Sequence, residues 1–349
     1  MAEQAFVTGK LETPVGTVPQ VATGVSWRDR WGAFRVRLGF GRMRYTVEPG
    51  LYGVGAPRQD SPVLVTANYK LSFDHLRTAL VGHDAWILVL DTSGINVWCA
   101  AGKGTFGTAP LSVQVAASRL AQLVGHRRLV VPQLGAPGIA AHAVKRQCGF
   151  SVVFGPVQAK HLPEFLDRGM QATPAMRRKT FSLPERAVLV PVELVIACKW
   201  ALPLAVVLSG ISGLFGPAAF WENVREHGGW TMAGLGSGIV AGTVLTPLLL
   251  PVLPGRAFSL KGAVAGLMAG LAFLAVLLSR PGGAGNDFAV WAWLLLIPAI
   301  ASFFGMEFTG ASTYTSLSGV RKEMRIAVPL QVAATLCGML LLFCARRLP

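Results

Sequence analysis

The chain has 349 residues, of which 52% are hydrophobic and only 14% are charged, a balance far from that of an average soluble protein. The hydrophobic excess lies after residue 187, so we expect a water-exposed part followed by a membrane part. The net charge of +15 is compatible with nucleic-acid binding, but the basic residues are scattered and gather beside hydrophobic segments, which argues against a nucleic-acid partner.

Residues 1–60 are expected to form a polar lead-in and a β-hairpin. The chain starts without the basic and apolar stretches of a signal peptide, so we expect the water-exposed part to stay in the cytoplasm. Between residues 31 and 45, Phe34, Val36 and Leu38 alternate with charged or small residues. That alternation predicts a hairpin or edge strands with the arginines on a solvated face.

Residues 61–170 alternate strand and helix patterns. Strands are predicted near residues 62–66, 85–90, 129–131 and 151–154, and helices near 72–80, 108–125, 138–147 and 163–168. This rhythm predicts an α/β domain with an open, largely parallel, Rossmann-like sheet. Ligands of such sheets bind at the carboxyl ends of the strands. The candidate ligand-side loops are therefore residues 66–70, 93–108, 132–137 and 155–160.

Residues 171–186 form a basic linker, and residues 187–349 are predicted to form an all-α transmembrane bundle of five helices. Each segment is about long enough to cross the hydrocarbon core. The five segments are residues 200–221, 231–253, 262–279, 288–306 and 327–344.

The basic residues beside these segments predict the topology. The linker, Arg256 with Lys261, and Arg321 to Arg325 fall on one side, whereas Arg225, Arg280 and the C-terminal arginines fall on the other. By the positive-inside rule the first domain lies in the cytoplasm, and the chain is a multi-pass protein of the cytoplasmic (inner) membrane.

Two membrane segments carry the pattern Gly-x-x-x-Gly-x-x-x-Gly, which lets helices approach closely in lipid. The glycines are Gly234, Gly238 and Gly242 in one segment and Gly262, Gly266 and Gly270 in the other. The alternative, a path for a substrate, usually requires charge inside the membrane, and only Glu193 and Lys199 approach that. A structural bundle is the favoured interpretation.

Cys99 stands among small residues, just after the apolar run at residues 85–90. Near the start of a short helix its thiolate would be stabilised by the helix N-terminus. The neighbouring Ala100, Ala101 and Gly102 would let a bulky ligand lie close to the backbone. This combination suggests a ligand-facing cysteine, but the spacing alone is equally compatible with a buried structural one.

Several familiar sites are excluded by their spacing. Gly102 and Lys103 resemble part of a phosphate-binding loop, but Val97 replaces its first glycine and Gly104 its Ser/Thr. No Gly-x-Gly-x-x-Gly pattern follows the first strand, so a dinucleotide site is not expected, and the cobalamin pattern Asp-x-His-x-x-Gly is missing. The five cysteines form no Cys-x-x-Cys pair, so neither a zinc ribbon nor an iron–sulfur ligand set is expected.

Residues 96–103, Asn-Val-Trp-Cys-Ala-Ala-Gly-Lys, match the signature Asn-Val/Ile-Trp-Cys-Ala-Ala/Gly-Gly-Lys at every position. The chain therefore resembles the mercury-methylating corrinoid proteins, the HgcA family. Residues 61–157 are similar to the corrinoid-binding domain of the corrinoid iron–sulfur protein, and five membrane helices after that domain are the family's architecture. The resemblance covers roughly residues 60–345.

The resemblance implies that Cys99 is the catalytic residue and the lower axial ligand to the cobalt of a base-off cobalamin. It implies that a cap helix begun by Asn96, which holds it through backbone hydrogen bonds, lies under the corrin. The implied cofactor-binding residues are Asn96, Val97, Trp98, Cys99, Ala100, Ala101, Gly102, Lys103, Gly104 and Thr105. A weaker assignment adds loop residues that would hold the corrin periphery and nucleotide tail: Thr66, Asn68, Pro132, Gly155 and Pro156.

Two members of the cap helix keep open roles. Trp98 either packs against the macrocycle or fills the core, and the core is favoured. Lys103 either meets a corrin side-chain amide or lies solvated near the helix end.

The resemblance further implies a methyltransferase that passes a methyl group from methyl-Co(III) cobalamin to Hg(II), forming methylmercury. Because Hg(II) is an electrophile, a thiolate that donates charge to cobalt suits this transfer better than a neutral histidine. The implied partners are a ferredoxin-like protein with two four-iron four-sulfur clusters and a methyl donor from a methyl-folate pathway, at a lipid membrane.

Two alternatives remain. The first is a membrane-anchored corrinoid methyltransferase with another native acceptor, because the motif specifies cobalt ligation and not the acceptor. The second is a transporter or sensor whose cytoplasmic domain only binds cobalamin. It predicts polar groups deep in the bundle, which are scarce in the sequence.

Overall fold

The computed structural model describes residues 4–215, 218–279, 287–312 and 317–347. The chain divides into two compact units between Thr180 and Phe181, within the residues expected to form the basic linker. Arg280, one of the charges used for the expected topology, lies outside the described residues.

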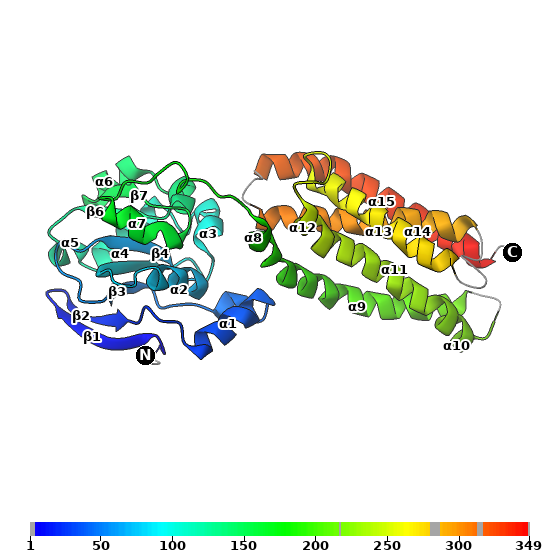
Figure 1. Ribbon diagram of the computed structural model, residues 1–349, viewed down its shortest axis with the longest axis horizontal. Helices are drawn as coiled ribbons and strands as arrows, with labels where there is room; N and C mark the ends of the chain where they lie inside the picture. The colour runs from blue at the N-terminus through cyan, green and yellow to red at the C-terminus, as the bar shows by residue number, and fades with distance from the viewer. Residues whose placement is uncertain (1–3, 216–217, 280–286, 313–316, 348–349) are drawn as a thin grey trace. The chain divides into compact units, whose positions relative to one another are not determined.

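The first unit is built on one mixed sheet, with seven strands among the described residues in the order β1-β2-β3-β5-β4-β6-β7 (Figure 1). The strands are β1 (Val7–Thr13), β2 (Gly16–Val21), β3 (Gly50–Val54), β4 (Val63–Ala67), β5 (Ala85–Leu90), β6 (Arg128–Val131) and β7 (Ser151–Phe154). Strands β5, β4, β6 and β7 are parallel, which confirms the expected parallel sheet. Strand β3 joins its edge antiparallel to β5, and β1 and β2 form a hairpin beyond it.

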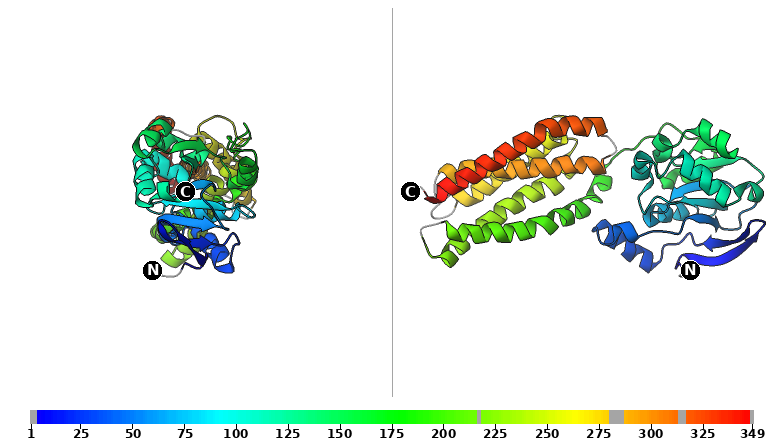
Figure 2. Two further views of the ribbon diagram at one scale, coloured as in Figure 1. Left: turned by 90° about the vertical axis from the view of Figure 1, so that its left-hand side faces the viewer. Right: turned by 180° about the vertical axis from the view of Figure 1, so that it is seen from behind.

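Helices cover both faces of this sheet (Figures 1 and 2). The helical segments are α1 (Trp27–Arg37), η1 (Arg42–Arg44), α2 (Lys70–Thr78), α3 (Val97–Lys103), α4 (Thr108–Ala117), α5 (Leu120–Leu123), η2 (Gln133–Gly138), α6 (Ala141–Cys148), η3 (Ala159–His161) and α7 (Leu162–Asp167). All six residues of β5 are buried, as expected for a central strand covered on both faces. Trp86, Leu88 and Leu90 pack under α3 to α6, whereas Ala85, Ile87 and Val89 pack under α2 and α7.

The strands expected between Trp31 and Tyr45 are wrong, because this stretch contains α1 and η1. Ser26 caps the helix, its hydroxyl accepting from the amide of Asp29 while the Asp29 carboxylate accepts from the amide of Ser26. This reciprocal capping favours a helix after Ser26, although apolar and polar residues alternate in the sequence that follows. The actual hairpin, β1–β2, lies in the expected lead-in.

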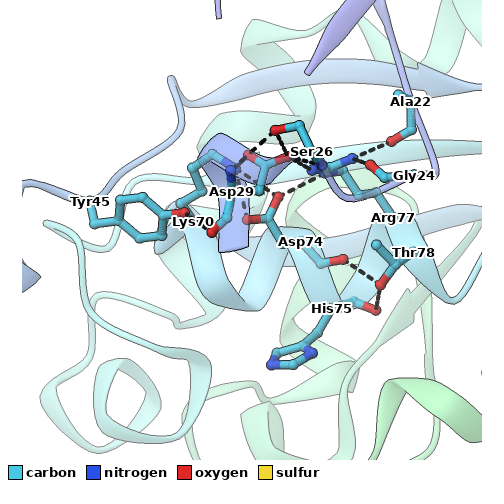
Figure 3. Close-up of polar contacts among 10 residues, drawn as sticks. All are labelled: Ala22, Gly24, Ser26, Asp29, Tyr45, Lys70, Asp74, His75, Arg77 and Thr78. Carbon is cyan, nitrogen blue, oxygen red and sulfur yellow. Dashed lines mark hydrogen bonds and ion pairs between the residues drawn. The ribbon is translucent and has the colours of Figure 1, made fainter. Parts of the chain in front are cut away.

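Four charged side chains attach α1 to α2 (Figure 3). The ammonium of Lys70 lies 2.7 Å from both Asp29 and Asp74. The guanidinium of Arg77, which is fully buried, lies 2.9 Å from Asp29 and 2.7 Å from Asp74. Burial alone would raise the pKa of Asp29, but hydrogen bonds from Lys70 and from Ser26 prevail and lower it to about 2. The network contains two charges of each sign and is neutral as a whole.

Among its described residues, the second unit has five helical segments long and apolar enough to cross a membrane, which confirms the expected number. The spans are Leu183–Leu214, Phe220–Leu249, Phe258–Leu278, Asp287–Gly310 and Ser318–Arg346. They contain α8 (Leu183–Ala187), α9 (Val190–Leu214), α10 (Phe220–Asn223), η4 (Val224–Gly228), α11 (Gly229–Val240), η5 (Ala241–Leu245), α12 (Thr246–Leu249), α13 (Phe258–Leu278), α14 (Asp287–Glu307), η6 (Phe308–Ala311) and α15 (Leu317–Arg347).

The first span is shifted from its expected position at residues 200–221. Helix α9 already begins at Val190, with Pro191 in its first turn, and it ends at Leu214. Glu193 and Lys199, which lie before the expected segment, are part of this helix. Two charges do not break a helix whose backbone hydrogen bonds are all internal.

Both glycine patterns pack against α14, which contacts α11, α13 and α15 in the bundle (Figure 2). An added Cβ at Gly266 would lie 2.6 Å from the Cα of Pro298, and one at Gly238 would lie 2.9 Å from the side chain of Ile300. Only glycine permits such backbone approach, so the predicted close packing of these helices is confirmed.

Candidate functional site

The parallel strands define one candidate edge for ligand binding. After β4 the chain crosses to β5, and then returns across β4 to β6 on its other side. The order of the strands therefore reverses between β4 and β6, and ligands of open α/β sheets bind outside the carboxyl ends of the strands at such a point. The loops after β4, β5 and β6 lead from this edge.

Asn68, directly after β4, holds the loop that follows β5. Its side-chain oxygen accepts from the amide of Thr92 at 3.1 Å, from the Thr92 hydroxyl at 2.8 Å and from the amide of Gly94 at 3.0 Å. Its side-chain nitrogen donates to Asp91 at 3.1 Å. Asn68 is buried, and these bonds use its oxygen fully. Asn68 therefore fixes the loop, and its predicted contact with a ligand stays a prediction.

This loop makes a sharp turn before the cap helix. Ser93 and Gly94 both have left-handed backbone, with φ of 56° and 72°. A Cβ at Gly94 would lie 2.8 Å from the carbonyl oxygen of Met43, so the loop also rests against η1. The turn is thus fixed from two sides, by Asn68 and by η1.

Asn96 caps helix α3, as the resemblance implied. Its side-chain oxygen accepts from the amide of Cys99 at 2.9 Å. Gly104, with φ of 84°, ends the helix in the left-handed conformation. The cap bonds the residue that carries the thiol, so it sets the position of Cys99 as well as the start of the helix.

Helix α3 has two different faces. Val97, Ala100 and Ala101 are buried, whereas Gly102 and Lys103 are exposed and Cys99 is half-buried. The expectation that Ala100 and Ala101 leave room for a ligand stays a prediction. They face inward, and of the three small residues only Gly102 faces out.

The inward alanines serve close packing against η2. A Cβ at Gly138 would lie 3.1 Å from the Cα of Ala101, so the two backbones are in direct contact. Phe106 is fully buried, and its ring packs against Gly135 in the same segment. Small residues at this contact bring α3 close to the loop after β6 and leave the thiol on the outer side.

The remaining cap residues lie at the margins. Trp98 and Thr105 are half-buried, and Trp98 is not among the residues of the two apolar clusters of the first unit. The favoured assignment of Trp98 to the core is therefore not supported. Lys103 is exposed, which both of its open roles allow.

The weaker loop assignments have different outcomes. Thr66 lies inside β4 and is buried, so it is not on a loop as expected. Pro132 begins the turn after β6 and is half-buried. Gly155 and Pro156 follow β7 and are buried, with the amide of Gly155 donating to Val131 at 2.8 Å. Pro132 thus lies at the strand-order reversal, and Gly155 and Pro156 lie one strand farther along the edge.

Two residues at the same edge were not singled out in the sequence, although Gln133 lies in the expected ligand-side loop at residues 132–137. Gln133, after β6, and His161, after β7, each have a buried side-chain atom, Oε1 and Nδ1, with no hydrogen-bond partner among the described residues. Buried polar atoms are nearly always paired, so unpaired ones are candidates for contact with a bound molecule. Neither residue belongs to a recognisable motif, so only their burial identifies them.

Among the described residues, the Cys99 thiol does not lie in a cluster of metal-binding side chains. In the part of the chain that the structure describes, no three His, Cys, Asp or Glu side chains are close enough together to hold a metal ion.

Comparisons with known proteins match this same unit. The family described as "CO dehydrogenase/acetyl-CoA synthase delta subunit" matches residues 41–166, from η1 to α7. Subunit gamma of the acetyl-CoA decarbonylase/synthase complex of Methanopyrus kandleri is 35% identical over 124 residues, 35% of this chain and 26% of that protein.

Subunits of the same description from two other archaea are also similar. The Archaeoglobus fulgidus protein is 30% identical over 127 residues, covering 35% of this chain and 26% of its own length. The Methanosarcina acetivorans protein is 31% identical over 134 residues, covering 36% and 28%. The chain thus spans about a quarter of the length of these curated relatives, and the likeness covers about a third of the chain.

Proposed function

We propose that the first unit binds a corrinoid, that Cys99 is the lower ligand to its cobalt, and that the chain is a membrane-bound methyltransferase. The observation that carries the proposal is the position of Cys99 on the outer face of α3, at the edge of the sheet where ligands bind. The match of residues 41–166 to a family of the acetyl-CoA synthase system supports it, since the motif at residues 96–103 resembles corrinoid proteins.

The surface beside Cys99 suits a broad, flat group. Gly102, one helical turn after Cys99, has open space where its Cβ would point, with no atom within 4 Å among the described residues. Residues three apart on a helix share a face. A macrocycle over this face meets no side chain at Gly102 and can approach the thiol.

The unpaired atoms at the same edge suit the periphery of such a group. The Gln133 oxygen can accept a hydrogen bond from an amide, and the His161 ring nitrogen can donate or accept according to its tautomer. Corrin side chains end in amides, so both atoms would gain the partner that they lack. Gln133 and His161 therefore join Pro132 and Gly155 as proposed neighbours of the cofactor.

A bound corrinoid supplies a cobalt centre that takes up and passes on a methyl group. Cys99 provides a soft, strongly donating sulfur, which stabilises an electron-poor metal better than imidazole does. Asn96 holds the backbone of Cys99, and the packing of Ala101 on Gly138 prevents the helix from tilting. These contacts would hold Cys99 in place beside a bound corrinoid.

We infer that the methyl acceptor is Hg(II), because an electrophilic acceptor matches a donating sulfur ligand. The proposal includes a ferredoxin-like iron–sulfur partner as electron source, since the sequence has no Cys-x-x-Cys pair of its own. A methyl-folate pathway is the proposed methyl source. The proposed setting is the cytoplasmic membrane, with the first unit in the cytoplasm.

The test compares Cys99→Ala with Cys148→Ala in the full chain supplied with cobalamin. Cys148 is the matched control, because it is another half-buried cysteine of the first unit and its thiol only donates to the carbonyl of Val144. We expect Cys99→Ala to lose the visible absorption of cobalt bound by sulfur and to form no methylmercury. The Cys148→Ala variant should keep both. An unchanged spectrum in Cys99→Ala would overturn the ligand role.

A second candidate acceptor is favoured by the comparisons, which name subunits of an acetyl-CoA decarbonylase/synthase complex. In that case the methyl group passes to another protein or small molecule, and Cys99 keeps the same role. Assays that offer Hg(II) and alternative acceptors to the same loaded protein distinguish the two. A protein that binds cobalamin through Cys99 but transfers methyl to no acceptor would instead favour a sensor or transporter.

A further inference from the structure

Helix α1 presents a ridge of aromatic side chains to the outside of the first unit. Trp27 is 76% exposed, and Trp31 and Phe34 are each 52% exposed. Their spacing of four and three residues places them in one line along the helix. The rings of Trp31 and Phe34 are stacked, with centroids 5.5 Å apart. Large aromatic side chains gathered at the surface mark a site of interaction.

Arginines flank this ridge on both sides. With 3.6 residues in each turn, Arg28 and Arg35 fall on one flank and Arg30 and Arg37 on the other. All four are exposed. The surface continues through η1, where Arg42, Arg44, Phe40 and Met43 are also exposed. We call residues 27–44 with these exposed side chains the aromatic–arginine surface.

The opposite face of α1 is fixed to the unit. Asp29 enters the buried network with Lys70 and Arg77, and Val36 is buried (Figure 3). Gly32 packs on Tyr45, whose ring atoms would lie 2.7 Å from an added Cβ. Asp29 is the only acidic residue in residues 27–44, and its charge is neutralised by that network. The exposed side of the helix is therefore purely cationic and aromatic.

We propose that the aromatic–arginine surface docks on the anionic headgroups of the membrane. Tryptophan and arginine are the side chains that prefer the membrane–water interface, the first for its amphipathic ring and the second for its phosphate-binding guanidinium. On such a surface the aromatic rings can enter the interface while the flanking guanidinium groups meet the phosphates. The charge of the surface is complementary to phosphate and to anionic lipids.

The membrane-length helices of the second unit would bring the first unit to a lipid surface. The second unit has five membrane-length spans among its described residues, and the first of them starts at Leu183, three residues after the first unit ends at Thr180. A tether of this length keeps the first unit close to lipid, which raises the effective concentration of the headgroups far above that for a free protein. A weak surface is then sufficient for docking.

Docking would act next to the candidate site. The Met43 carbonyl, in the same surface, lies against Gly94 in the loop that begins α3. Lys70 and Arg77, which hold α1, belong to the helix that directly follows Asn68 and Tyr69. A docked α1 would thus hold this edge of the sheet in a defined orientation to the membrane.

The test reconstitutes the full chain in vesicles that contain brominated phosphatidylcholine, with or without about 30% phosphatidylglycerol, an anionic lipid. Bromine quenches tryptophan that reaches the bilayer. A Trp27→Phe/Trp31→Phe variant keeps the aromatic ridge but loses its fluorescence. The difference in quenching between the natural chain and this variant therefore reports on α1 alone and cancels the tryptophans of the membrane spans. We expect a clear difference in anionic vesicles that falls at high salt.

The variant Arg28→Gln/Arg30→Gln/Arg35→Gln/Arg37→Gln tests the charge. Each arginine near an anionic surface raises binding about fivefold, so four substitutions should lower the ratio of docked to undocked protein several-hundred-fold. The matched control is Arg119→Gln/Arg128→Gln/Lys145→Gln/Arg146→Gln, which removes the same charge from other exposed positions of the unit. We expect the control to keep the quenching.

Three results would overturn the proposal. The first is equal quenching in the natural chain and the Trp27→Phe/Trp31→Phe variant in anionic vesicles, which would leave a protein or nucleic acid as the occupant. The second is quenching that does not depend on anionic lipid. The third is an equal loss in the arginine variant and in its control, which would show a general effect of net charge.

Discussion

The two units use opposite means to position their helices. In the second unit, glycines on α11 and α13 bring backbones against α14, and close contact holds the bundle. In the first unit a buried apolar sheet supplies the stability, while polar groups such as the Asp29–Lys70–Asp74–Arg77 network position α1 and Asn68 positions the loop before α3. In water, the burial of apolar surface stabilises the contact between elements. In lipid this driving force is missing, so helices associate through close packing of complementary surfaces.

The largest loss of stability is expected where the backbones of α13 and α14 are in direct contact. Gly266→Val places a side chain 2.6 Å from the Cα of Pro298, and no flexible group can yield there. We expect a loss of more than about 4 kcal/mol, in the upper range for a single substitution. The measurement is the thermal stability of the detergent-solubilised chain.

Gly236→Val is the control, because an added Cβ at Gly236 has no atom within 4 Å among the described residues. If both variants lose stability equally, the glycines act through helix propensity and not through close packing.

An intermediate loss of stability is expected from Lys70→Met, which keeps the volume of the side chain but removes one cation from the buried network. Asp29 and Asp74 would then share Arg77 alone. Because that partner remains, we expect the free energy of unfolding to fall by about 3 kcal/mol at neutral pH, the lower end of the range for a broken buried ion pair. Hydrogen exchange of the β4 and β5 amides measures it.

The same variant should show a defined pH dependence. The pKa of Asp29 is about 2 in the folded chain, below its ordinary value of 3.8, so its ion pair stabilises the fold above about pH 4. That contribution is lost as the pH falls through about 2, and the difference between the natural chain and Lys70→Met should shrink there. Lys145→Met, at an exposed site of α6, should show neither effect. A difference that is constant from pH 2 to 7 would contradict the role of Asp29.

The smallest effect is expected at the cap of α3. Asn96→Ala removes the acceptor of the Cys99 amide and should cost about 1 kcal/mol, since the packing of Ala101 on Gly138 remains. Faster hydrogen exchange at the amide of Cys99 measures the loss. Asn96→Ser keeps an acceptor and should restore most of the protection. Unchanged exchange in the alanine variant would show that packing alone holds the helix.

The sheet of the first unit was largely predictable. Residues 85–90 and 151–154 form strands at the expected bounds. A short apolar run between turn residues is typical of a buried strand and is shorter than most helices. Helix α1 was not predicted, because alternation at Phe34, Val36 and Leu38 imitates a strand. The capping pair Ser26 and Asp29 was the local pattern that indicated a helix.

The candidate site was predictable only in part. The motif at residues 96–103 located a short helix with Asn96 at its start and Cys99 in its first turn. It did not show that Ala100 and Ala101 face the protein, because the direction of a seven-residue helix depends on what packs against it. Gln133 and His161 were missed, because an unpaired polar atom exists only once its surroundings are folded.

The sequence by itself determined the division into an α/β part and a part with membrane-length helices, the parallel strands, the number of those helices among the described residues and the position of the cysteine. Each of these depends on local composition and periodicity. Tertiary structure alone decided which face of α3 is outward, that Asn68 holds its loop, and that α1 turns an aromatic–arginine surface away from the unit. These features arise from contacts between residues far apart in the chain, such as Asp29 with Arg77 and Ala101 with Gly138, and no local pattern specifies such contacts.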